Sequence, residues 1–307
     1  MNPGLTKLVD ALSPGATPVS LRRLRGGLGA NMHLLRYEMP SGERRNAVLR
    51  RYISEWTDST ADDARYEFRV LGLLGTAGIA APRPLLLDAD GTYFGRPAMV
   101  LSYIPGRSFF YPHDDAAWVD GLARGLAEVH GVTPQRFDLR WLHPMHAYKD
   151  RLNRDLERIA ENELAVQANE ALLAFGDAIE PQGPALVHDD YWPGNTVWYR
   201  GRLAAVIDWG SASLGDPRAD VAQCRADLVF SNGLGTADLF RERYEATTGV
   251  PVRELWYFDL FMGMRALLNY PRWLAGYHDA GLKHLELAGV GARIEAFVRR
   301  ALDGAVR

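Results

Sequence analysis

Two short stretches decide the interpretation of this sequence: His188-Asp189-Asp190-Tyr191-Trp192-Pro193-Gly194-Asn195 and, further on, Ile207-Asp208-Trp209. Asp190 stands five positions before Asn195, and Asp208 follows Asn195 by thirteen positions. Pro193-Gly194 predicts a turn that brings Asn195 back toward Asp190, and Arg200-Gly201 predicts a hairpin turn that brings Asp208 near both. Asn195 and Asp208 offer hard oxygen atoms, which are the ligands that magnesium takes.

These residue types at these spacings match the needs of phosphoryl transfer. That chemistry requires a carboxylate to orient and deprotonate the acceptor hydroxyl, oxygen ligands for magnesium, and a cation on the nucleotide phosphates. Kinase-type catalytic loops place the base Asp five positions before a metal-binding Asn, and a second metal-binding Asp follows. We therefore predict an ATP-dependent and Mg²⁺-dependent transfer to a hydroxyl, with Asp190 as the base and Asn195 and Asp208 as metal ligands.

The same residues, followed by Gly215-Asp216-Pro217 and Asp220-Val221-Ala222, resemble the aminoglycoside phosphotransferase and choline-kinase-like family. The resemblance covers roughly residues 15–300 and is sharpest over 186–222. It implies a bilobal α+β fold of the protein-kinase type, with a small β-rich lobe and a larger helical lobe. It also implies that His188, Asp216 and Asp220 support the catalytic loop structurally.

Two residues depart from the family pattern. Asp189 stands where the family usually has Gly, and it could raise the pKa of Asp190 or reach the substrate. Residues 47–50 resemble the strand that carries the phosphate-binding Lys, but the strand ends in Arg50. An Arg keeps the charge, so phosphate binding is retained. Arg51 lies on the opposite strand face, and we prefer Arg50.

The remaining nucleotide contacts are expected from the N-terminal part. The resemblance pairs Arg50 with Glu67 on a helix. It makes the loop containing Gly26, Gly27 and Gly29 a cover for the phosphates, although glycine clusters of this kind are more often plain turns. Residues 101–106 resemble the interlobe hinge, in which backbone groups of Ser102, Tyr103 and Ile104 would read the adenine edge.

The pattern of apolar residues and turn formers predicts two domains. Residues 1–104 form the nucleotide-binding lobe, with strands near 19–25, 32–38, 46–52, 84–87 and 98–104 and a helix over 62–74. Residues 105–307 form the catalytic and substrate-binding lobe. Helices are expected over 116–129, 147–178, 239–247, 252–270 and 292–301, with Pro271 ending the fourth, and short strands over 185–207.

Composition limits the expected cellular location and the classes of partner. The chain has 307 residues, a net charge of −3 and one cysteine, Cys224, so it can form no internal disulfide. A balanced charge gives no general attraction to nucleic acid or acidic membranes. The first fifteen residues lack a signal-peptide pattern, and no stretch is apolar enough to cross a membrane. We expect a cytoplasmic monomer or homodimer without nucleic-acid or membrane partners.

The acceptor is left open among aminoglycosides, macrolides, and amino alcohol or sugar metabolites. Asp189, Trp192 and Trp273 are candidate substrate contacts, whereas the aromatic residues of 256–277 are mainly expected in the helical core. Arg225 and Asp227 are expected on a solvated face, and His130 at the surface or a helix cap. Two alternatives remain: a metal-dependent phosphohydrolase that uses His188 and Asp189, and a nucleotide-binding module without activity. ATP and GTP are not distinguished.

Overall fold

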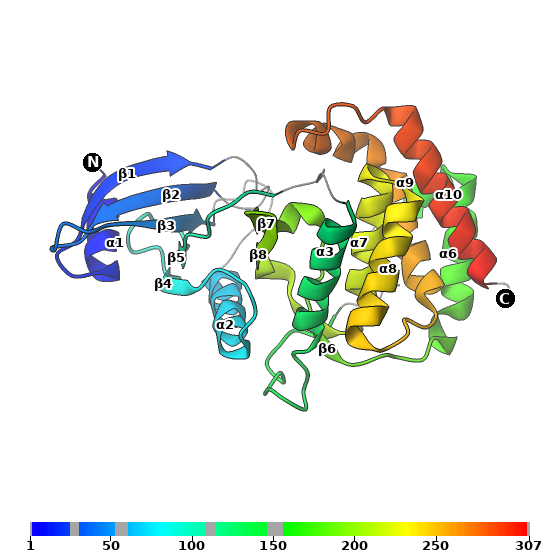
Figure 1. The fold of residues 1–307 in the computed structure, drawn as a ribbon, viewed down its shortest axis with the longest axis horizontal. Coiled ribbons are helices and arrows are strands. Elements are labelled where there is room, and N and C mark those ends of the chain that lie inside the picture. Colours follow the sequence, from blue (N-terminus) through cyan, green and yellow to red (C-terminus); the bar gives the residue numbers. More distant parts are fainter. Residues whose placement is uncertain (1, 25–30, 53–60, 109–114, 146–155, 306–307) are drawn as a thin grey trace. The chain divides into compact units, whose positions relative to one another are not determined.

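The computed structural model describes residues 2–24, 31–52, 61–108, 115–145 and 156–305, which form two compact units. One unit contains Met1–Gly106 together with Ala204–Gly210, and the other contains Arg107–Leu203 and Ser211–Arg307. Asp208 therefore belongs to the first unit, and Asp190 and Asn195 belong to the second. Figure 1 shows the β-rich and helical elements of the two units.

The first unit is built on an antiparallel sheet in the order β1-β2-β3-β5-β4. The strands are β1 (Thr17–Arg23), β2 (Asn31–Glu38), β3 (Arg44–Arg51), β4 (Pro84–Asp88) and β5 (Ala98–Ser102). Two helices pack on this sheet, α1 (Pro3–Leu12) and α2 (Ala61–Ala77). The expected strands and the helix over 62–74 are thus confirmed within a few residues, whereas α1 was not expected.

The alternation of side chains along β3 decides what each face of the sheet does. Ala47 and Leu49 are buried in the core that α1 completes with Leu5, Leu8 and Val9. Because successive side chains of a strand point to opposite faces, Arg50 lies on the other face. The hydrophobic core thus forms on one side of β3, and the polar group described below forms on the other.

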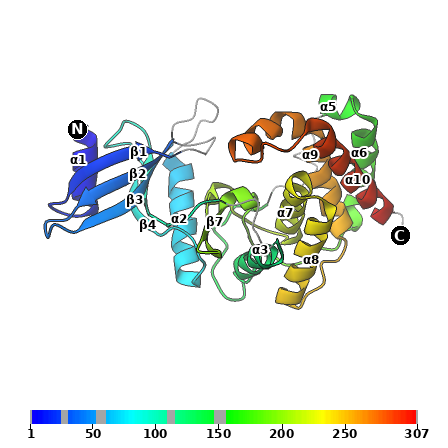
Figure 2. The same cartoon turned by 45° about the horizontal axis from the view of Figure 1, so that its top comes forward.

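The second unit is mainly helical. Its helices are α3 (Asp115–His130), α5 (Leu156–Ala160), α6 (Glu163–Phe175), α7 (Arg218–Ser231), α8 (Leu234–Thr248), α9 (Leu255–Asp279) and α10 (Leu287–Ala305). Helix α7 is buried along almost its whole length because α8, α9 and α10 pack around it (Figure 2). In the described part of the chain, none of the helices is both long and apolar enough to span a membrane.

Short strands carry the polar loop of this unit. β6 (Ala185–Val187) pairs antiparallel with β9 (Ser213–Gly215), and β7 (Thr196–Tyr199) pairs with β8 (Arg202–Val206). The turn between β7 and β8 places Arg200 and Gly201 at φ 52° and 75°, as expected for a tight hairpin turn. Two 3₁₀ turns follow β6 and β8, namely η2 (Pro193–Asn195) and η3 (Trp209–Ser211), and a third, η1 (Gly176–Ala178), follows α6.

Two helix predictions were wrong. The helix expected over 147–178 begins among residues outside the described ones, and beyond them it is interrupted. Asn162 separates α5 from α6 because its side chain accepts a hydrogen bond from the amide of Ala165 at 3.0 Å and caps α6.

The helix expected to end at Pro271 instead continues to Asp279. Proline at position 271 has no N–H to donate to the carbonyl of Leu267, and beside this break the Arg158 side chain donates to the next carbonyl, that of Leu268. Beyond the proline, the helix buries Leu274 and Tyr277, which offsets the cost of the break.

Candidate active site

The catalytic loop predicted from the sequence is a closed polar turn in the helical unit. The side-chain amide of Asn195 donates hydrogen bonds from Nδ2 to the carbonyl and to Oδ2 of Asp190, both at 2.9 Å. The η2 turn brings the two residues together, because the amide of Asn195 also donates to the carbonyl of Trp192 at 2.9 Å. Nδ2 faces two acceptors, so the amide oxygen of Asn195 points away from Asp190.

Asp220 holds the start of this loop through the backbone. Its Oδ2 accepts from the amide of His188 at 2.6 Å, and its Oδ1 accepts from the amide of Asp189 at 2.8 Å. Asp220 is fully buried on α7, and Nε2 of His130 lies 3.2 Å from Oδ2. A buried carboxylate is stabilised by several donors of this kind, so the loop and α7 are held as one body.

His130 was expected either at the surface or at a helix cap, and the expectation that it lies at the surface is wrong. It ends α3 with 8% of its surface exposed, and its Nδ1 lies 2.7 Å from the hydroxyl of Tyr244. Both ring nitrogens are thus engaged, one by Asp220 and one by Tyr244. The pairing joins α3 to α7 and α8, which come about 90 residues later in the sequence. The position of His130 at the end of a helix was therefore the available signal.

Asp189 adopts a backbone conformation that explains the family preference for glycine at this position. Its φ is 60°, in the left-handed region that glycine enters without steric cost and that Asp tolerates better than most residues. Asp208 has a similar φ of 67°. The departure from the family pattern is therefore compatible with the turn.

Aromatic residues fix the loop on its other sides. The hydroxyl of Tyr191 donates to the carbonyl of Leu122 on α3 at 2.8 Å, and burial raises the pKa of this phenol well above its ordinary value. The ring of Trp192 lies where a side chain on Gly194 would begin, since a Cβ there would meet ring atoms at 2.2–2.6 Å. Position 194 therefore requires glycine as long as Trp192 keeps this orientation.

His188 and Asp216 are the other two residues predicted to support the loop. His188 is fully buried, and its ring meets that of Tyr191 edge-on at 6.1 Å. Asp216 lies farther away: its Oδ2 accepts from the amide of Gln182 at 2.9 Å, and its carboxylate pairs with Arg218. Asp216 thus stabilises the segment that leads into β6, one element before the loop.

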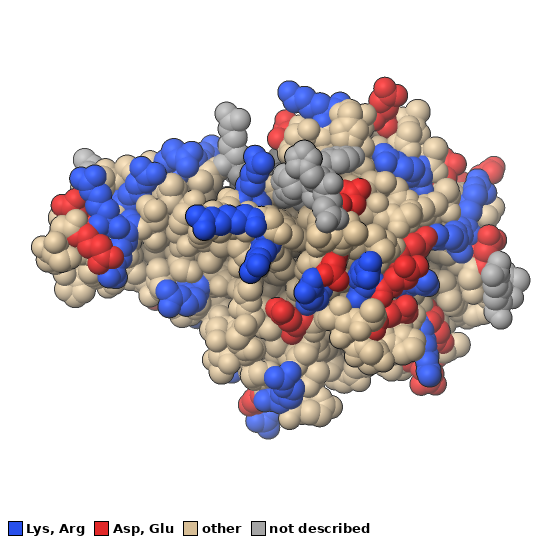
Figure 3. All heavy atoms as spheres, in the orientation of Figure 1, with Lys and Arg blue, Asp and Glu red and all other residues tan. Residues whose placement is uncertain are grey.

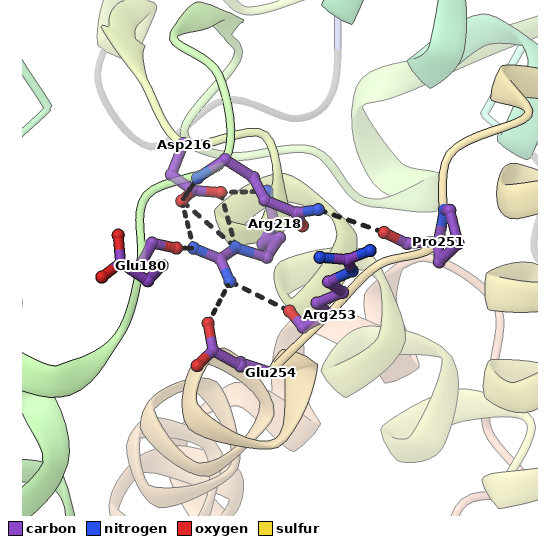
Figure 4. Close-up of polar contacts among 7 residues, drawn as sticks. Glu180, Asp216, Arg218, Pro251, Arg253 and Glu254 are labelled. Carbon is purple, nitrogen blue, oxygen red and sulfur yellow. Dashed lines mark hydrogen bonds and ion pairs between the residues drawn. The ribbon is translucent and has the colours of Figure 1, made fainter.

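Arg218 is the centre of a buried hydrogen-bond network that sequence reasoning missed (Figure 4). It is 1% exposed and donates to the carbonyl of Glu180 at 2.6 Å, to that of Arg253 at 3.0 Å, and to the carboxylates of Asp216 and Glu254 at 2.6 and 3.1 Å. This network connects the segment before β6 and the turn before α9 to the start of α7. An Arg directly after the Asp216-Pro217 pair was the available signal.

A second polar group lies in the β-rich unit. Nη1 of Arg50 lies 3.1 Å from Oε1 of Glu67 on α2 and 2.9 Å from Oδ1 of Asp208. The hydroxyl of Tyr52 donates to Oε2 of Glu67 at 2.5 Å. Burial raises the pKa of Glu67, although the Arg50 charge and the Tyr52 hydrogen bond oppose that rise. Sequence reasoning anticipated Arg50, Glu67 and Asp208 but missed Tyr52.

The other predicted nucleotide-binding residues divide into three cases. Arg51 lies over the ring of Phe94 at 4.7 Å, away from Glu67. Ser102 uses its amide to bond the carbonyl of Arg83 at 2.9 Å, so this N–H is not available to a nucleotide, whereas Tyr103 is exposed and Ile104 half-buried. Gly26, Gly27 and Gly29 lie outside the described residues.

The prediction that Arg225 and Asp227 lie on a solvent-exposed face is wrong. Arg225 is 3% exposed and pairs with Asp259 at 3.0 Å, and Asp227 is 8% exposed. Both lie on a helix that other helices surround. Trp273, a predicted substrate contact, lines a small cavity together with Asp227, and Trp192 is half-buried.

Two side chains, each taken within its own unit, present a hard oxygen of the kind that magnesium takes. They are the amide oxygen of Asn195, turned away from Asp190, and the carboxylate of Asp208, whose side chain is 45% exposed. By contrast, the described residues contain no group of three His, Cys, Asp or Glu side chains placed to hold a metal ion by themselves.

Comparison with known proteins identifies the family. The model of the phosphotransferase enzyme family matches residues 25–256, about three quarters of the chain. This chain belongs to the phosphotransferase enzyme family. The resemblance seen in the sequence is confirmed.

A curated relative is acyl-CoA dehydrogenase family member 10 of Mus musculus. It is 26% identical over 276 residues, which make up 85% of this chain and 25% of that protein. The chain spans about a quarter of the length of the curated relatives it matches.

Solved structures show the same fold, which confirms the protein-kinase-like prediction. Macrolide 2'-phosphotransferase of Brachybacterium faecium is 20% identical, with a TM-score of 0.62 and coverage of 94% of this chain and 98% of that one. Choline kinase of Streptococcus pneumoniae is 18% identical, with a TM-score of 0.59 and coverage of 98% and 97%. A thermostable mutant of an aminoglycoside phosphotransferase, in complex with ADP and hygromycin B, is 18% identical, with a TM-score of 0.62 and coverage of 96% and 97%.

Proposed function

We propose that this chain transfers the γ-phosphoryl group of ATP to a hydroxyl of a small molecule, with Asp190 as the base. The observation that carries the proposal is the closed turn in which Asn195 holds the Asp190 carboxylate while Asp220 holds the backbone before it. A positioned carboxylate next to an outward amide oxygen is the arrangement that hydroxyl phosphorylation requires.

In the proposed reaction, Asp190 accepts the proton of the acceptor hydroxyl. The hydroxyl oxygen forms a bond to the γ-phosphorus, and the bond from that phosphorus to the β–γ bridging oxygen breaks, so that ADP leaves with the electron pair. Asn195 and Asp208 would hold Mg²⁺, which neutralises phosphate charge when it is bound. Arg50 would bind the phosphates, and Glu67 orients it.

For the acceptor, the similar solved structures, a macrolide phosphotransferase, an aminoglycoside phosphotransferase with hygromycin B and a choline kinase, favour antibiotics and amino alcohols as candidates. The charges on the face drawn in Figure 3 are mixed over the helical unit, which gives no preference for an acceptor of one sign. The dehydrogenase name of the mouse relative does not bear on the reaction proposed for this chain, because the match covers a quarter of that protein.

The phosphohydrolase alternative is disfavoured by His130. That reading needs further histidine or aspartate ligands near His188 and Asp189. Both nitrogens of His130 are already occupied by Asp220 and Tyr244. The contact between Arg50 and Asp208 does favour the other alternative, a module that binds nucleotide without turnover, because it occupies an oxygen that a metal would use.

The test is a coupled ADP-release screen over antibiotics, amino alcohols and amino sugars with Mg²⁺-ATP. We expect turnover with one acceptor class, loss of at least about a thousandfold in Asp190→Asn, and unchanged ATP binding by calorimetry. Asp138→Asn, at an exposed position on the same unit, is the matched control. ATP binding without phosphorylation of any acceptor would support the inactive module.

A further inference from the structure

Tyr277 connects the catalytic loop to a buried carboxylate on α7. Its hydroxyl donates to Oδ1 of Asp227, and its ring stacks on Phe230 with centroids 4.1 Å apart and planes at 16°. The same ring meets Trp192 of the catalytic loop at 5.7 Å and 56°. Tyr277 is 5% exposed, so the ring lies enclosed between α7 and the loop.

Asp227 is arranged to hold Tyr277 rather than to receive a large ligand. Its second oxygen, Oδ2, accepts from Nε2 of Gln223 at 2.7 Å. The cavity beside it, which Arg265 and Trp273 also line, measures about 10 Å³ and has room for roughly one water molecule. An acceptor substrate does not fit there without a rearrangement, so the described contacts of Asp227 are those of a support.

The position of Tyr277 affects Asp190 and Asn195 through the ring of Trp192. Its ring lies directly over Gly194, in the η2 turn, and that turn places Asn195 against Asp190. A shift of the Trp192 ring therefore forces the turn to move, because interior groups are close-packed. Burial, followed by the charges of Asp227 and Asp190, raises the pKa of Tyr277 well above its ordinary value, so the phenol keeps the proton that it donates.

We propose that Tyr277, anchored by Asp227, is a positioning residue for phosphoryl transfer: it fixes Trp192 and thereby the geometry of the Asp190–Asn195 turn. The inference rests on the proposed function. It concerns the acceptor-activating group alone, since Tyr277, Asp227 and Trp192 all belong to the helical unit.

The kinetic test uses Tyr277→Phe, which keeps the ring and removes the anchoring hydroxyl, and Asp227→Asn, which removes the carboxylate charge. Misplacement of a reacting group by an ångström costs up to about a hundredfold in rate, so we expect kcat to fall roughly 10- to 100-fold in either variant. The KM for ATP should stay within about twofold. The double variant should lose no more than the worse single variant, because both changes break one connection.

Tyr257→Phe is the matched control, since it makes the same substitution on the same helix at a ring that packs on Trp256 and Phe258. Its kcat should be unchanged. An unchanged kcat in Tyr277→Phe, or losses in the double variant that multiply, would overturn the proposal.

A second readout does not depend on turnover. In protein labelled with 5-fluorotryptophan, the ¹⁹F resonance of Trp192 is identified by its absence in Trp192→Phe. We expect it to shift or broaden in Tyr277→Phe and Asp227→Asn, and to stay in place in Tyr257→Phe. A Trp192 resonance that is identical in all four proteins would refute the positioning role, even if the kinase function holds. A shifted resonance in a protein that phosphorylates nothing would instead show that the proposed function fails while the connection exists.

Discussion

Arg50 pairs with two carboxylates in the β-rich unit, those of Glu67 and Asp208. Its removal should lower stability, because the buried carboxylate of Glu67 loses its cationic partner. The Glu67 side chain is 2% exposed, and the guanidinium of Arg50 is its cationic partner at 3.1 Å. The substitution Arg50→Met keeps much of the aliphatic length and removes the charge. Tyr52 still donates one hydrogen bond to Glu67, but a single neutral donor does not balance a buried carboxylate.

The size of the stability loss in Arg50→Met is bounded by two free energies. Removing one partner of a buried ion pair costs about 3–5 kcal/mol. Glu67 can escape part of this cost by taking a proton, and from the ordinary pKa of 4.5 protonation at pH 7 costs at most about 3.4 kcal/mol. Burial already raises that pKa, so the ceiling is lower, and we expect a loss of roughly 2–3 kcal/mol at pH 7. The pair with Asp208 adds little, since that carboxylate is 45% exposed.

Native-state hydrogen exchange of the amides in β3 and α2 measures this loss within the unit concerned, without assuming that both units unfold together. At pH 5 the loss should shrink by at least about 1 kcal/mol, because protonation of Glu67 becomes easier. The double variant Arg50→Met/Glu67→Gln should recover much of the stability. A loss of the same size at both pH values, or a double variant as unstable as Arg50→Met, would refute the reasoning.

Three further predictions concern the helical unit. Asp220→Ala leaves the amides of His188 and Asp189 without their acceptor, and we expect a loss of about 2–5 kcal/mol by urea unfolding and at least a tenfold fall in kcat. Burial raises the pKa of Asp227 to about 6 from an ordinary 3.8, so the folded protein holds more protons and stability falls as pH rises from about 4 to 6. Asp227→Asn should remove up to about 3 kcal/mol of this fall, measured as unfolding free energy against pH. Arg218→Lys cannot satisfy both carbonyls and both carboxylates, and it should lower Tm by several degrees in calorimetry while Arg136→Lys, at an exposed site, does not.

Much of the fold could be predicted from local patterns. The strands of the first unit alternate around turns, and the helix over 62–74 has a clear apolar face, so both were found within a few residues. Pro271 and Asn162 were misjudged because distant contacts decide those positions. A proline usually ends a helix, but the packing of Leu274 and Tyr277 beyond it outweighs that preference here.

By itself, the sequence determined the residue types and spacing of the proposed catalytic loop, because Asp190, Pro193 and Asn195 lie within one local turn whose geometry depends on near neighbours. The family resemblance also implied that Asp220 supports that loop, and its carboxylate accepts from the amides of His188 and Asp189. Only the tertiary structure decided which distant side chains complete the site: His130 against Asp220, Tyr52 against Glu67, and Tyr277 between Asp227 and Trp192. These pairs join elements separated by up to about 90 positions, and their partners are selected by burial and close packing, which leave no fixed spacing in the chain.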